Sequence, residues 1–454
     1  MQLRSDSAPA DLHLTLVTED ASLDPAAARV ATTLKDGEVT LVRGESRDVA
    51  LALPPLDVSA ARALGVKIAR LAKDVRATSV STDEFNPEFA PAFAIGVTLG
   101  AYRFTKFKSD DAPVLSSVSV GGLTDELAER IVAVASGVNL ARDLVNRPLN
   151  DLTPKDFTRE AHKLADEFGL ELEVWGRAEC EVRGMRLFLA VNEGSAHEPQ
   201  FIQLTYKPQH ATRVIALVGK SVMFDTGGYS IKTSAGMATM KCDMGGGAAV
   251  LGAMRALALL KPDVEVRAYL PACDNAISGA AMRPGDVFRA ANGKTVEVTN
   301  TDAEGRLTLA DALTIACDEG ADLVVDLATL TGAKVVALGD DLAALFTSDA
   351  AVEFELREAA ARADEGMWPM PLHSAYLKGY KKGPADLKNS DLKPSGGAIK
   401  AALFLREFVT KPWAHLDIAG CAFAEGEHDL GPSGGTGYGV MTLVELVAPT
   451  TALS

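Results

Sequence analysis

The stretch from Val218 to Gly247 constrains the fold of this chain more than any other. It reads VGKSVMFDTGGYSIKTSAGMATMKCDMGGG, and the apolar run Val214–Val218 leads directly into it. Such a run is typical of a strand buried on both faces of a parallel sheet. Because ligands of open α/β sheets gather beyond the carboxyl ends of the strands, we expect a site in the glycine-rich segment that follows. Four charged residues stand in that segment: Lys220, Asp225, Lys232 and Asp243.

The second half of the chain alternates predicted strands and helices. This alternation predicts an α/β fold with a central mixed, mostly parallel sheet flanked by helices. Expected strands are Leu170–Val174, Phe201–Tyr206, Val214–Val218, Val264–Leu270, Leu323–Leu327 and Ala414–Ile418. Expected helices are Gly246–Leu260, Leu307–Cys317, Val352–Arg362 and Gly397–Phe408.

The first 140 residues are expected to form a smaller α/β domain with a structural or oligomeric role. Residues 11–120 alternate the short apolar runs LHLTLV, VTLVRG and AFAIGVTLG with polar turns, and they contain one helical pattern near Ala60–Lys73. A helix over about 123–146, capped by Thr124, joins this domain to a larger domain over 147–454, which contains the glycine-rich segment. The next helix is expected to start after Thr153, with Pro154 at its first position.

Composition narrows the function classes. The 454-residue chain has a formal net charge of −16, which argues against a nucleic-acid partner. Charged or polar residues interrupt every apolar run well before the roughly 18 residues that a membrane span needs. The N-terminus has no apolar core of a signal peptide, and the five cysteines form no C-x-x-C pair, which favours reduced thiols. We therefore expect a cytoplasmic protein.

A metal centre in this chain would have to be rich in carboxylates. The seven histidines form no H-x-x-x-H pair, so the helical zinc-protease motif is absent. The octapeptide NTDAEGRL, Asn300–Leu307, adds Asp302 and Glu304 to Asp225 and Asp243. Four negative charges would balance two divalent ions bound close together. Alternatively, Asp302 caps a helix starting near Gly305, and Glu304 is an acid of its first turn.

Of three cationic residues near these carboxylates, the two lysines have two interpretations each and the arginine has one. Lys220 either forms an ion pair or, as a neutral amine, binds a metal ion that lowers its pKa. Lys232 is either a solvated loop charge or a fixed cation aimed at a developing oxyanion. Arg306 lies in the first turn of a predicted helix, where the helix dipole disfavours a cation, so we expect an anion to be held there.

These two motifs resemble the leucyl aminopeptidase family, the M17 metallopeptidases. NTDAEGRL is a highly specific signature, and GKSVMFDTGGYSIKTSAGMATMKCDMGG matches over nearly thirty positions. Further similar segments, among them LVNRPLNDLTP, PACDNAISGAAMRPGDV, DLATLTGA and ADLKNS, extend the resemblance over Ala141–Val447. The N-terminal part is similar only loosely. Small departures are Tyr229, where an aliphatic residue is commoner, an additional glycine in Gly245–Gly247, and Cys242 beside Asp243.

The resemblance implies a role for each matching position. It places two divalent ions on five residues, with Asp225 and Glu304 bridging them. It assigns Lys232 to the scissile carbonyl and Arg306 to a bicarbonate that acts as general base. Manganese or zinc is implied, with magnesium and cobalt also accepted by such ligands. The implied metal ligands are Lys220, Asp225, Asp243, Asp302 and Glu304, and the implied substrate-binding residues are Lys232, Met240, Thr329, Leu330 and Gly332.

The resemblance further implies a metal-dependent aminopeptidase that releases leucine and other, mainly apolar, residues from peptides with a free N-terminus. The family's usual assembly, a homohexamer, is implied with it. Two rival interpretations remain. A carboxylate-rich two-metal centre also suits a phosphoesterase, and some relatives act as DNA-binding accessory proteins. Comparing the hydrolysis of leucine anilides with that of phenyl phosphates distinguishes the aminopeptidase from the phosphoesterase. A DNA gel shift that weakens as salt rises tests the DNA-binding role.

Overall fold

The computed structural model describes residues 1–4, 10–18, 23, 25–44, 47–109, 114–428 and 431–450. The chain divides into two compact units. Unit 1 comprises Met1–Asn139 and Glu425–Ser433, and unit 2 comprises Leu140–Ala424 and Gly434–Ser454. Helix α4 (Asp125–Asn146) contains the point at which the chain passes from unit 1 to unit 2. The return of Glu425–Ser433 to unit 1 was not predicted, because no change in composition marks it.

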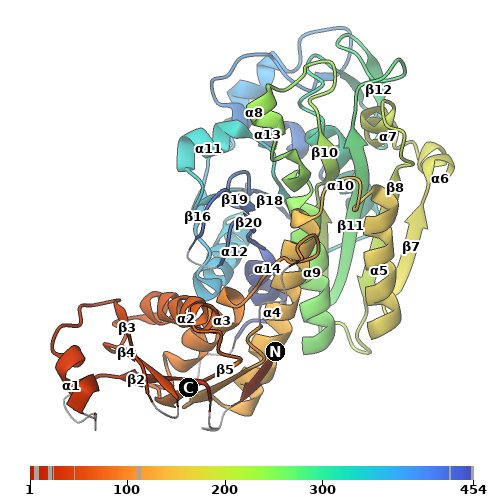
Figure 1. Cartoon of the computed structure of the whole chain (residues 1–454). Helices are drawn as coiled ribbons and strands as arrows, with labels where there is room; N and C mark the ends of the chain where they lie inside the picture. The colour runs from red at the N-terminus through yellow and green to blue at the C-terminus, as the bar shows by residue number, and fades with distance from the viewer. Residues whose placement is uncertain are drawn as a thin grey trace. The chain divides into compact units, whose positions relative to one another are not determined.

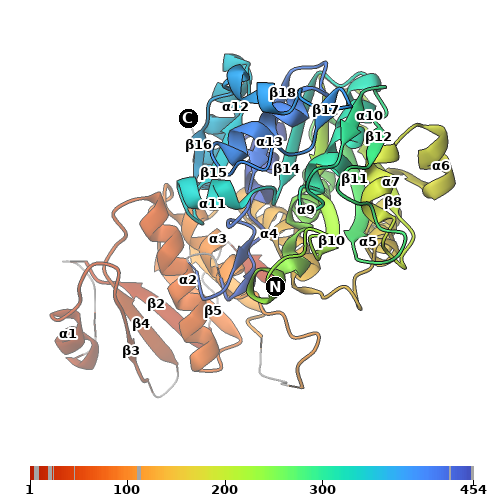
Figure 2. The ribbon, with the colours of Figure 1, turned by 90° about the horizontal axis from the view of Figure 1, so that it is seen from above.

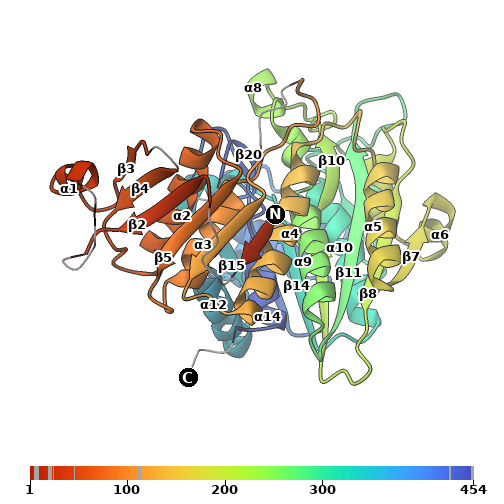
Figure 3. The ribbon, with the colours of Figure 1, turned by 60° about the horizontal axis from the view of Figure 1, so that its bottom comes forward.

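Unit 1 is built on a six-stranded sheet with the strand order β1-β6-β5-β2-β4-β3. Its strand pairs are parallel except for β3 and β4, and Figure 3 shows the strands of this sheet side by side. The elements are β1 (Gln2–Arg4), β2 (Leu12–Leu16), α1 (Pro25–Ala31), β3 (Val39–Val42), β4 (Asp48–Ala52), α2 (Val58–Asp74), β5 (Ser79–Glu84), α3 (Ala90–Gly100) and β6 (Ser117–Gly121).

Helix α3 corrects the sequence analysis of this unit. The run AFAIGVTLG was grouped with the short apolar runs, whereas one helical pattern was expected, near Ala60–Lys73. That pattern is α2, and the run AFAIGVTLG lies in a second helix. Burial explains the difference: eight of the eleven residues of α3 are buried, so its sequence shows no polar face from which a helical period could be read. Glycines allow α2 and α3 to pack closely, because a Cβ on Gly65 would lie 2.3 Å from the carbonyl oxygen of Phe93.

Unit 2 is organised around a nine-stranded mixed sheet, which confirms the predicted fold class. The strand order is β16-β15-β18-β14-β9-β11-β8-β7, and β10 also pairs with β11. The central strands β18, β14, β9 and β11 are parallel. Strand β8 runs antiparallel to both of its neighbours, and β15 is antiparallel to β18 but parallel to β16. Helices α5 and α9 pack against one face and α7 and α10 against the other, as Figures 1 and 2 show.

The strands and helices that the sequence predicted in unit 2 are present and overlap the expected ranges, whereas β10, β15, β16, α6, α7 and α14 were not predicted. The strands are β7 (Glu171–Trp175), β8 (Gln200–Tyr206), β9 (Val214–Gly219), β10 (Ser221–Asp225), β11 (Glu265–Asn275), β14 (Leu323–Ala328), β15 (Ala343–Phe346), β16 (Met367–Pro369) and β18 (Trp413–Asp417). The helices are α5 (Pro154–Phe168), α6 (Arg177–Val182), α7 (Arg186–Asn192), α9 (Gly245–Leu260), α10 (Gly305–Asp318), α12 (Ala350–Ala363), α13 (Gly397–Arg406) and α14 (Val440–Val447).

Shorter elements complete unit 2. They are α8 (Ser234–Met237), η1 (Met240–Cys242), β12 (Val287–Arg289), β13 (Thr295–Glu297), α11 (Gly332–Leu338), η2 (Ser374–Gly379), β17 (Leu387–Lys388), β19 (Phe423–Ala424) and β20 (Gly434–Gly435). The predicted start of α5 is confirmed, because Thr153 accepts a hydrogen bond from the backbone N–H of Asp156 and Pro154 opens the helix.

Helix α9 fixes the geometry of the site through its glycines. A Cβ on Gly246 would lie 2.0 Å from the carbonyl oxygen of Leu327, and one on Gly247 would lie 2.1 Å from Ser221 Oγ. Only glycine therefore allows the first turn of α9 to approach β14 and the start of β10 this closely. This close approach sets Asp243, which lies just before the helix, beside the ends of the strands.

One described stretch, Ser234–Leu260, is long and apolar enough to match a membrane span by length and composition. However, 83% of its most apolar window is buried inside the protein. Such burial is typical of a core helix of a globular domain. The five cysteines are all unpaired and buried, which agrees with the expected reduced thiols.

Candidate active site

The site lies at the carboxyl ends of the parallel strands of unit 2. Lys220 directly follows β9, and Asp225 is the last residue of β10. Asp243 lies just before α9, while Asp302 and Glu304 lie just before α10. The parallel arrangement of β9, β11 and β14 brings these segments to one edge of the sheet, because parallel strands end on the same side.

Lys220 is bound between two carboxylates in the interior. Its Nζ lies 2.8 Å from Asp243 Oδ1 and 2.8 Å from Glu304 Oε1. The same amine donates to the carbonyl oxygen of Thr329 at 3.0 Å. The side chain passes over Gly305, where a Cβ would lie only 2.4 Å from Lys220 Cε. The glycine of NTDAEGRL therefore leaves the space through which Lys220 reaches its partners.

Lys232 joins a second pair of carboxylates. Its Nζ lies 2.7 Å from Asp225 Oδ2 and 2.5 Å from Asp302 Oδ1. The loop that carries it turns at Gly227 and Gly228, which have φ angles of 84° and 60°. Side-chain-bearing residues rarely adopt such angles, so these glycines make the turn possible. The interpretation of Lys232 as a solvated loop charge is wrong.

The alternative in which Asp302 caps α10 and Glu304 is an acid of its first turn is also wrong. The N-cap residue of α10 is Glu304 itself, in a helical conformation and with no side-chain cap hydrogen bond. Its carboxylate instead contacts Lys220. Asp302, Asp225 and Glu304 offer carboxylate oxygens that all lie within 4.8 Å of one another. This spacing is the kind that metal ions require of a shared ligand set.

The carboxylates shift one another's pKa values. Burial, together with the charge of Glu304, raises the pKa of Asp225 to about 6, against the influence of Lys232 and Lys220. Burial and the charges of Glu304 and Asp225 raise the pKa of Asp243 as well. Burial alone would lower the pKa of Lys220, but Asp243, Glu304 and Asp225 outweigh it and raise the pKa. These three shifts favour the addition of positive charge to the site. Glu304 differs, because Lys220 and Lys232 outweigh its burial and lower its pKa.

The residues present fit a pair of divalent ions. Four carboxylates face two lysines, so the site is short of positive charge, which bound cations would supply. Asp243 Oδ2 is buried and has no hydrogen-bond partner among the described residues. An unpaired buried carboxylate oxygen is costly unless a ligand satisfies it. Lysine can serve as a ligand only after a nearby ion has lowered its raised pKa.

Arg306 lies beside this cluster on the first turn of α10. Its Nη1 donates to the hydroxyl of Tyr380 at 2.9 Å and to the carbonyl oxygen of Asn389 at 2.8 Å. Its Nε is buried without a hydrogen-bond partner among the described residues. The guanidinium therefore has a donor left for an anion, and the expectation that an anion is held there stays a prediction.

Three supporting residues were missed by sequence reasoning. Asn275 donates to Asp225 Oδ1 at 2.8 Å and to the carbonyl oxygen of Thr301 at 3.0 Å. The side chain of Asn389, fully buried, accepts from the N–H of Thr299 at 2.8 Å and donates to the carbonyl oxygen of Asn300 at 2.6 Å. Asp417 accepts from Thr331 Oγ1 at 2.6 Å. The two asparagines lie in the sequence motifs CDN and KNS. Their hydrogen-bond partners are distant in sequence, so the motifs alone could not indicate what the asparagines do.

A cavity of about 550 Å³ opens over the carboxylates. Each residue that the resemblance assigned to metal or substrate contributes to its wall, as does Arg306. The apolar part of the wall includes Met240, Leu330, Val335 and Phe423. Cys242 also lines it, but burial and the charge of Asp243 raise the pKa of its thiol to about 12. That thiol is therefore protonated and unreactive at neutral pH.

Comparisons with known proteins agree with one another. A sequence profile described as the catalytic domain of the cytosol aminopeptidase family, peptidase family M17, matches residues 139–444. A probable cytosol aminopeptidase of Synechococcus sp. (strain WH7803) is 50% identical over 79% of this chain and 75% of its own. The protein of the same description from Microcystis aeruginosa is 47% identical, over 86% of this chain and 82% of its own.

Solved structures give the same result. The bottromycin maturation enzyme BotP in complex with Mn superposes with a TM-score of 0.90 at 36% identity, covering 97% of this chain and 99% of its own. A mutant of tomato leucine aminopeptidase superposes with a TM-score of 0.89 at 33% identity, covering 99% of this chain and 97% of its own.

The contact between Gly305 and Lys220 generates a prediction. A Gly305→Ala substitution should displace the flexible end of Lys220 and leave the fold intact. We expect manganese affinity, measured by isothermal titration calorimetry, to fall about tenfold or more, the cost of one lost charge-assisted contact. The thermal unfolding midpoint should change little. Gly279→Ala is the matched control, because a Cβ there meets nothing within 4 Å. Unchanged affinity in Gly305→Ala would contradict the role given to Lys220.

Proposed function

The chain belongs to the cytosol aminopeptidase family and is a metal-dependent aminopeptidase, and from this premise we propose that it releases leucine and other, mainly apolar, amino acids from peptides. The observation that carries the proposal is the single cavity that combines the carboxylates and lysines with an apolar wall. Met240 and Leu330 in that wall suit an apolar side chain, because burying it removes apolar surface from water.

We infer that five residues hold two divalent ions, with Asp225 and Glu304 bridging them. Manganese or zinc is proposed, and magnesium and cobalt suit the same oxygen-rich ligands. When bound, such ions polarise a carbonyl and activate water for amide hydrolysis. The proposed ligands are Lys220, Asp225, Asp243, Asp302 and Glu304.

The same carboxylates explain a requirement for a free N-terminus. With divalent ions held on these carboxylates, a free N-terminal amine would be able to bind one of the ions, whereas a blocked terminus would lack that ligand. The apolar wall then holds the first side chain, with Met240, Thr329, Leu330 and Gly332 as the proposed contacts. Exopeptidase specificity follows from this arrangement.

Lys232 is proposed as the group that stabilises negative charge on the carbonyl oxygen of the substrate. Burial alone would lower the pKa of this lysine, but Asp225 and Glu304 outweigh it, so the amine is protonated at neutral pH. A fixed cation aimed at a developing oxyanion lowers the barrier of acyl transfer. The contacts of Lys232 with Asp225 and Asp302 hold it at the rim of the carboxylate cluster.

Arg306 is proposed to hold bicarbonate, which would accept a proton during the reaction. Its unpaired buried Nε and its place in the first turn of α10 both favour an anion. Tyr380 and Asn389 fix the guanidinium from the other side. We further propose a cytoplasmic location and a homohexameric assembly, which rest on family membership alone.

The direct test of this function is hydrolysis of leucine p-nitroanilide by the purified protein. Activity should disappear after chelation and return on addition of manganese or zinc. Phenyl phosphate serves as the matched alternative substrate. Turnover of phenyl phosphate without hydrolysis of the anilide would favour the phosphoesterase, and silence with both substrates under every metal would favour a binding protein.

Replacement of Lys232 tests its proposed role. Lys232→Met should lower kcat about 100-fold or more, the effect of removing one oxyanion donor, and should change KM little. Steady-state kinetics with leucine p-nitroanilide measures both constants. Lys378→Met, which removes an exposed lysine of the same unit outside the cavity, is the control. A rise in KM at constant kcat would instead show that Lys232 only binds the ground state.

Replacement of Arg306 tests the anion site. Arg306→Met should reduce kcat far more than it raises KM, because the guanidinium acts on the proton acceptor and not on the peptide. Added bicarbonate should stimulate the wild-type enzyme and leave the variant unchanged. An unaltered turnover number in Arg306→Met would exclude the proposed role.

A further inference from the structure

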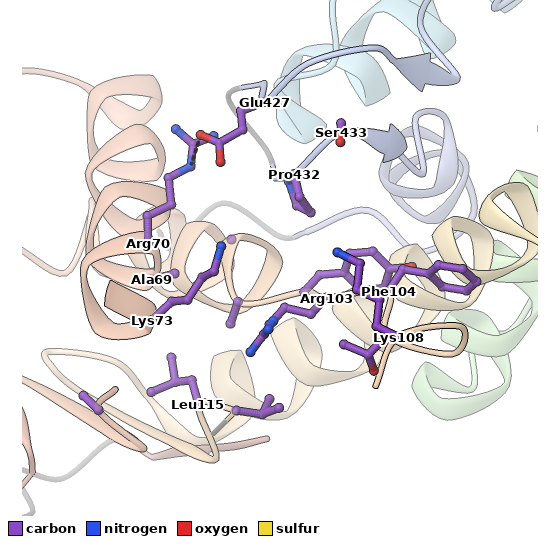
Figure 4. A pocket seen from close by; sticks show the side chains of 16 residues that line it. Ala69, Arg70, Lys73, Arg103, Phe104, Lys108, Leu115, Glu427, Pro432 and Ser433 are labelled. Atoms are coloured by element: carbon purple, nitrogen blue, oxygen red, sulfur yellow. Dashed lines mark ion pairs between the residues drawn. The ribbon is translucent and has the colours of Figure 1, made fainter. Parts of the chain in front are cut away.

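A second cavity lies within unit 1, and the described residues of its wall carry an excess of positive charge. It measures about 170 Å³ and is lined by Arg70, Lys73, Arg103 and Lys108, with Glu427 as the one carboxylate among the described lining residues. These residues come from the end of α2, from the loop after α3 and from the returning segment Glu425–Ser433. Figure 4 shows Lys73, Arg103 and Lys108 around the hollow, with Glu427 beside Arg70. In a chain with a net charge of −16, composition does not account for this cluster.

Arg70 has a structural task in this cavity. Its Nη2 donates to the carbonyl oxygens of His428 at 2.6 Å and Gly431 at 3.4 Å. Its Nε lies 3.7 Å from Glu427 Oε2. Arg70 therefore holds the returning segment against α2, and it also forms an ion pair with Glu427. The carboxylate of Glu427 is thus engaged by Arg70.

Lys73 and Lys108 are the cations that a ligand could reach. Neither ammonium group has an ion-pair or hydrogen-bond partner within the described residues. Both are exposed side chains, and apolar residues, among them Ala69, Ala77 and Leu115, line the same hollow. A bound anion would be attracted to both ammonium groups.

We propose that this hollow is a binding site for a small multivalent oxyanion, namely the phosphate or pyrophosphate group of a phosphorylated metabolite. The volume suits one or two tetrahedral anionic groups and excludes a polymer from its interior. Lysine and arginine are the side chains that bind phosphate through charge-assisted hydrogen bonds. Tyr102 and Phe104, which also line the cavity, offer aromatic surface to the uncharged part of such a molecule.

The competing explanation is purely structural. Helix α2 ends at Asp74 and α3 ends at Gly100. Cations near the carboxyl ends of helices complement the helix dipoles, which would account for Lys73 and Arg103 without a ligand. In addition, Asp110, Asp111 and Asp429 lie outside the described residues. An experiment must therefore separate ligand binding from dipole compensation and from neutralisation by the chain's own carboxylates.

The test is isothermal titration of inorganic pyrophosphate into the full-length, metal-free protein. Removal of the metals prevents pyrophosphate from acting as a chelator at the active site. We expect one site per chain, with an affinity that falls as the salt concentration rises. The double variant Lys73→Ala/Lys108→Ala should weaken binding about tenfold or more, the effect of losing one or two charge-assisted contacts. Lys106→Ala is the matched control, because Lys106 lies in the same loop and does not line the cavity.

Two further measurements assign the signal. Arg306→Met should retain pyrophosphate binding, whereas loss of binding in this variant would place the anion at the active site and overturn the proposal. Titration with ADP in place of pyrophosphate shows which kind of molecule carries the bound phosphate. Tighter binding of ADP would indicate a nucleotide, and equal binding would indicate the inorganic anion.

Three results would contradict the proposal. The first is no binding by the wild-type protein. The second is a lower thermal unfolding midpoint of Lys73→Ala/Lys108→Ala with unchanged binding, which would show that these lysines only compensate the helix ends. The third is binding that appears only in Asp110→Asn/Asp111→Asn, which would show that the chain's own carboxylates fill the hollow.

Discussion

The buried excess of negative charge at the ends of the central strands is the constraint on which the rest of unit 2 depends. Four carboxylates lie around two lysines. Burial raises the pKa values of Asp225 and Asp243, and the charge of Glu304 adds to the effect. A cluster of this kind costs free energy on folding unless cations compensate it. The charges of Lys220 and Lys232 supply part of that compensation, and the raised pKa values show that more positive charge is favoured.

The fold satisfies this constraint by rigid placement. Parallel strands β9 and β14 deliver Lys220 and Thr329, and the glycine-rich start of α9 delivers Asp243 against them. Asn275 and Asn389 connect the remaining carboxylate-bearing segments through hydrogen bonds to Asp225 and to the backbone before α10. Each ligand candidate is thus positioned by secondary structure or by a buried amide, which limits the reorganisation needed when a cation binds.

Sequence reasoning predicted the parts of this arrangement that depend on local pattern. The apolar run Val214–Val218, the cap at Thr153 and the alternation of strands and helices all have short-range causes, and the structure confirms them. The partners of Lys220 and the buried donors of Asn389 depend on tertiary contacts between segments distant in sequence, so periodicity could not reveal them. Helix α3 was not predicted for another reason. A helix that is buried on nearly all sides has no polar face, and the alternation of polar and apolar residues that indicates a helix is missing. The return of Glu425–Ser433 to unit 1 has no local signal at all.

The most direct test of this account is a count of the divalent ions that the chain holds. Metal-free protein would be titrated with manganese, and the bound metal would be measured by elemental analysis after gel filtration. The account predicts two ions per chain in the wild type and a reduced number in Asp243→Ala, whose Oδ2 has no hydrogen-bond partner among the described residues. Wild-type protein that retains no manganese, or an Asp243→Ala variant that retains two ions with unchanged affinity, would contradict it.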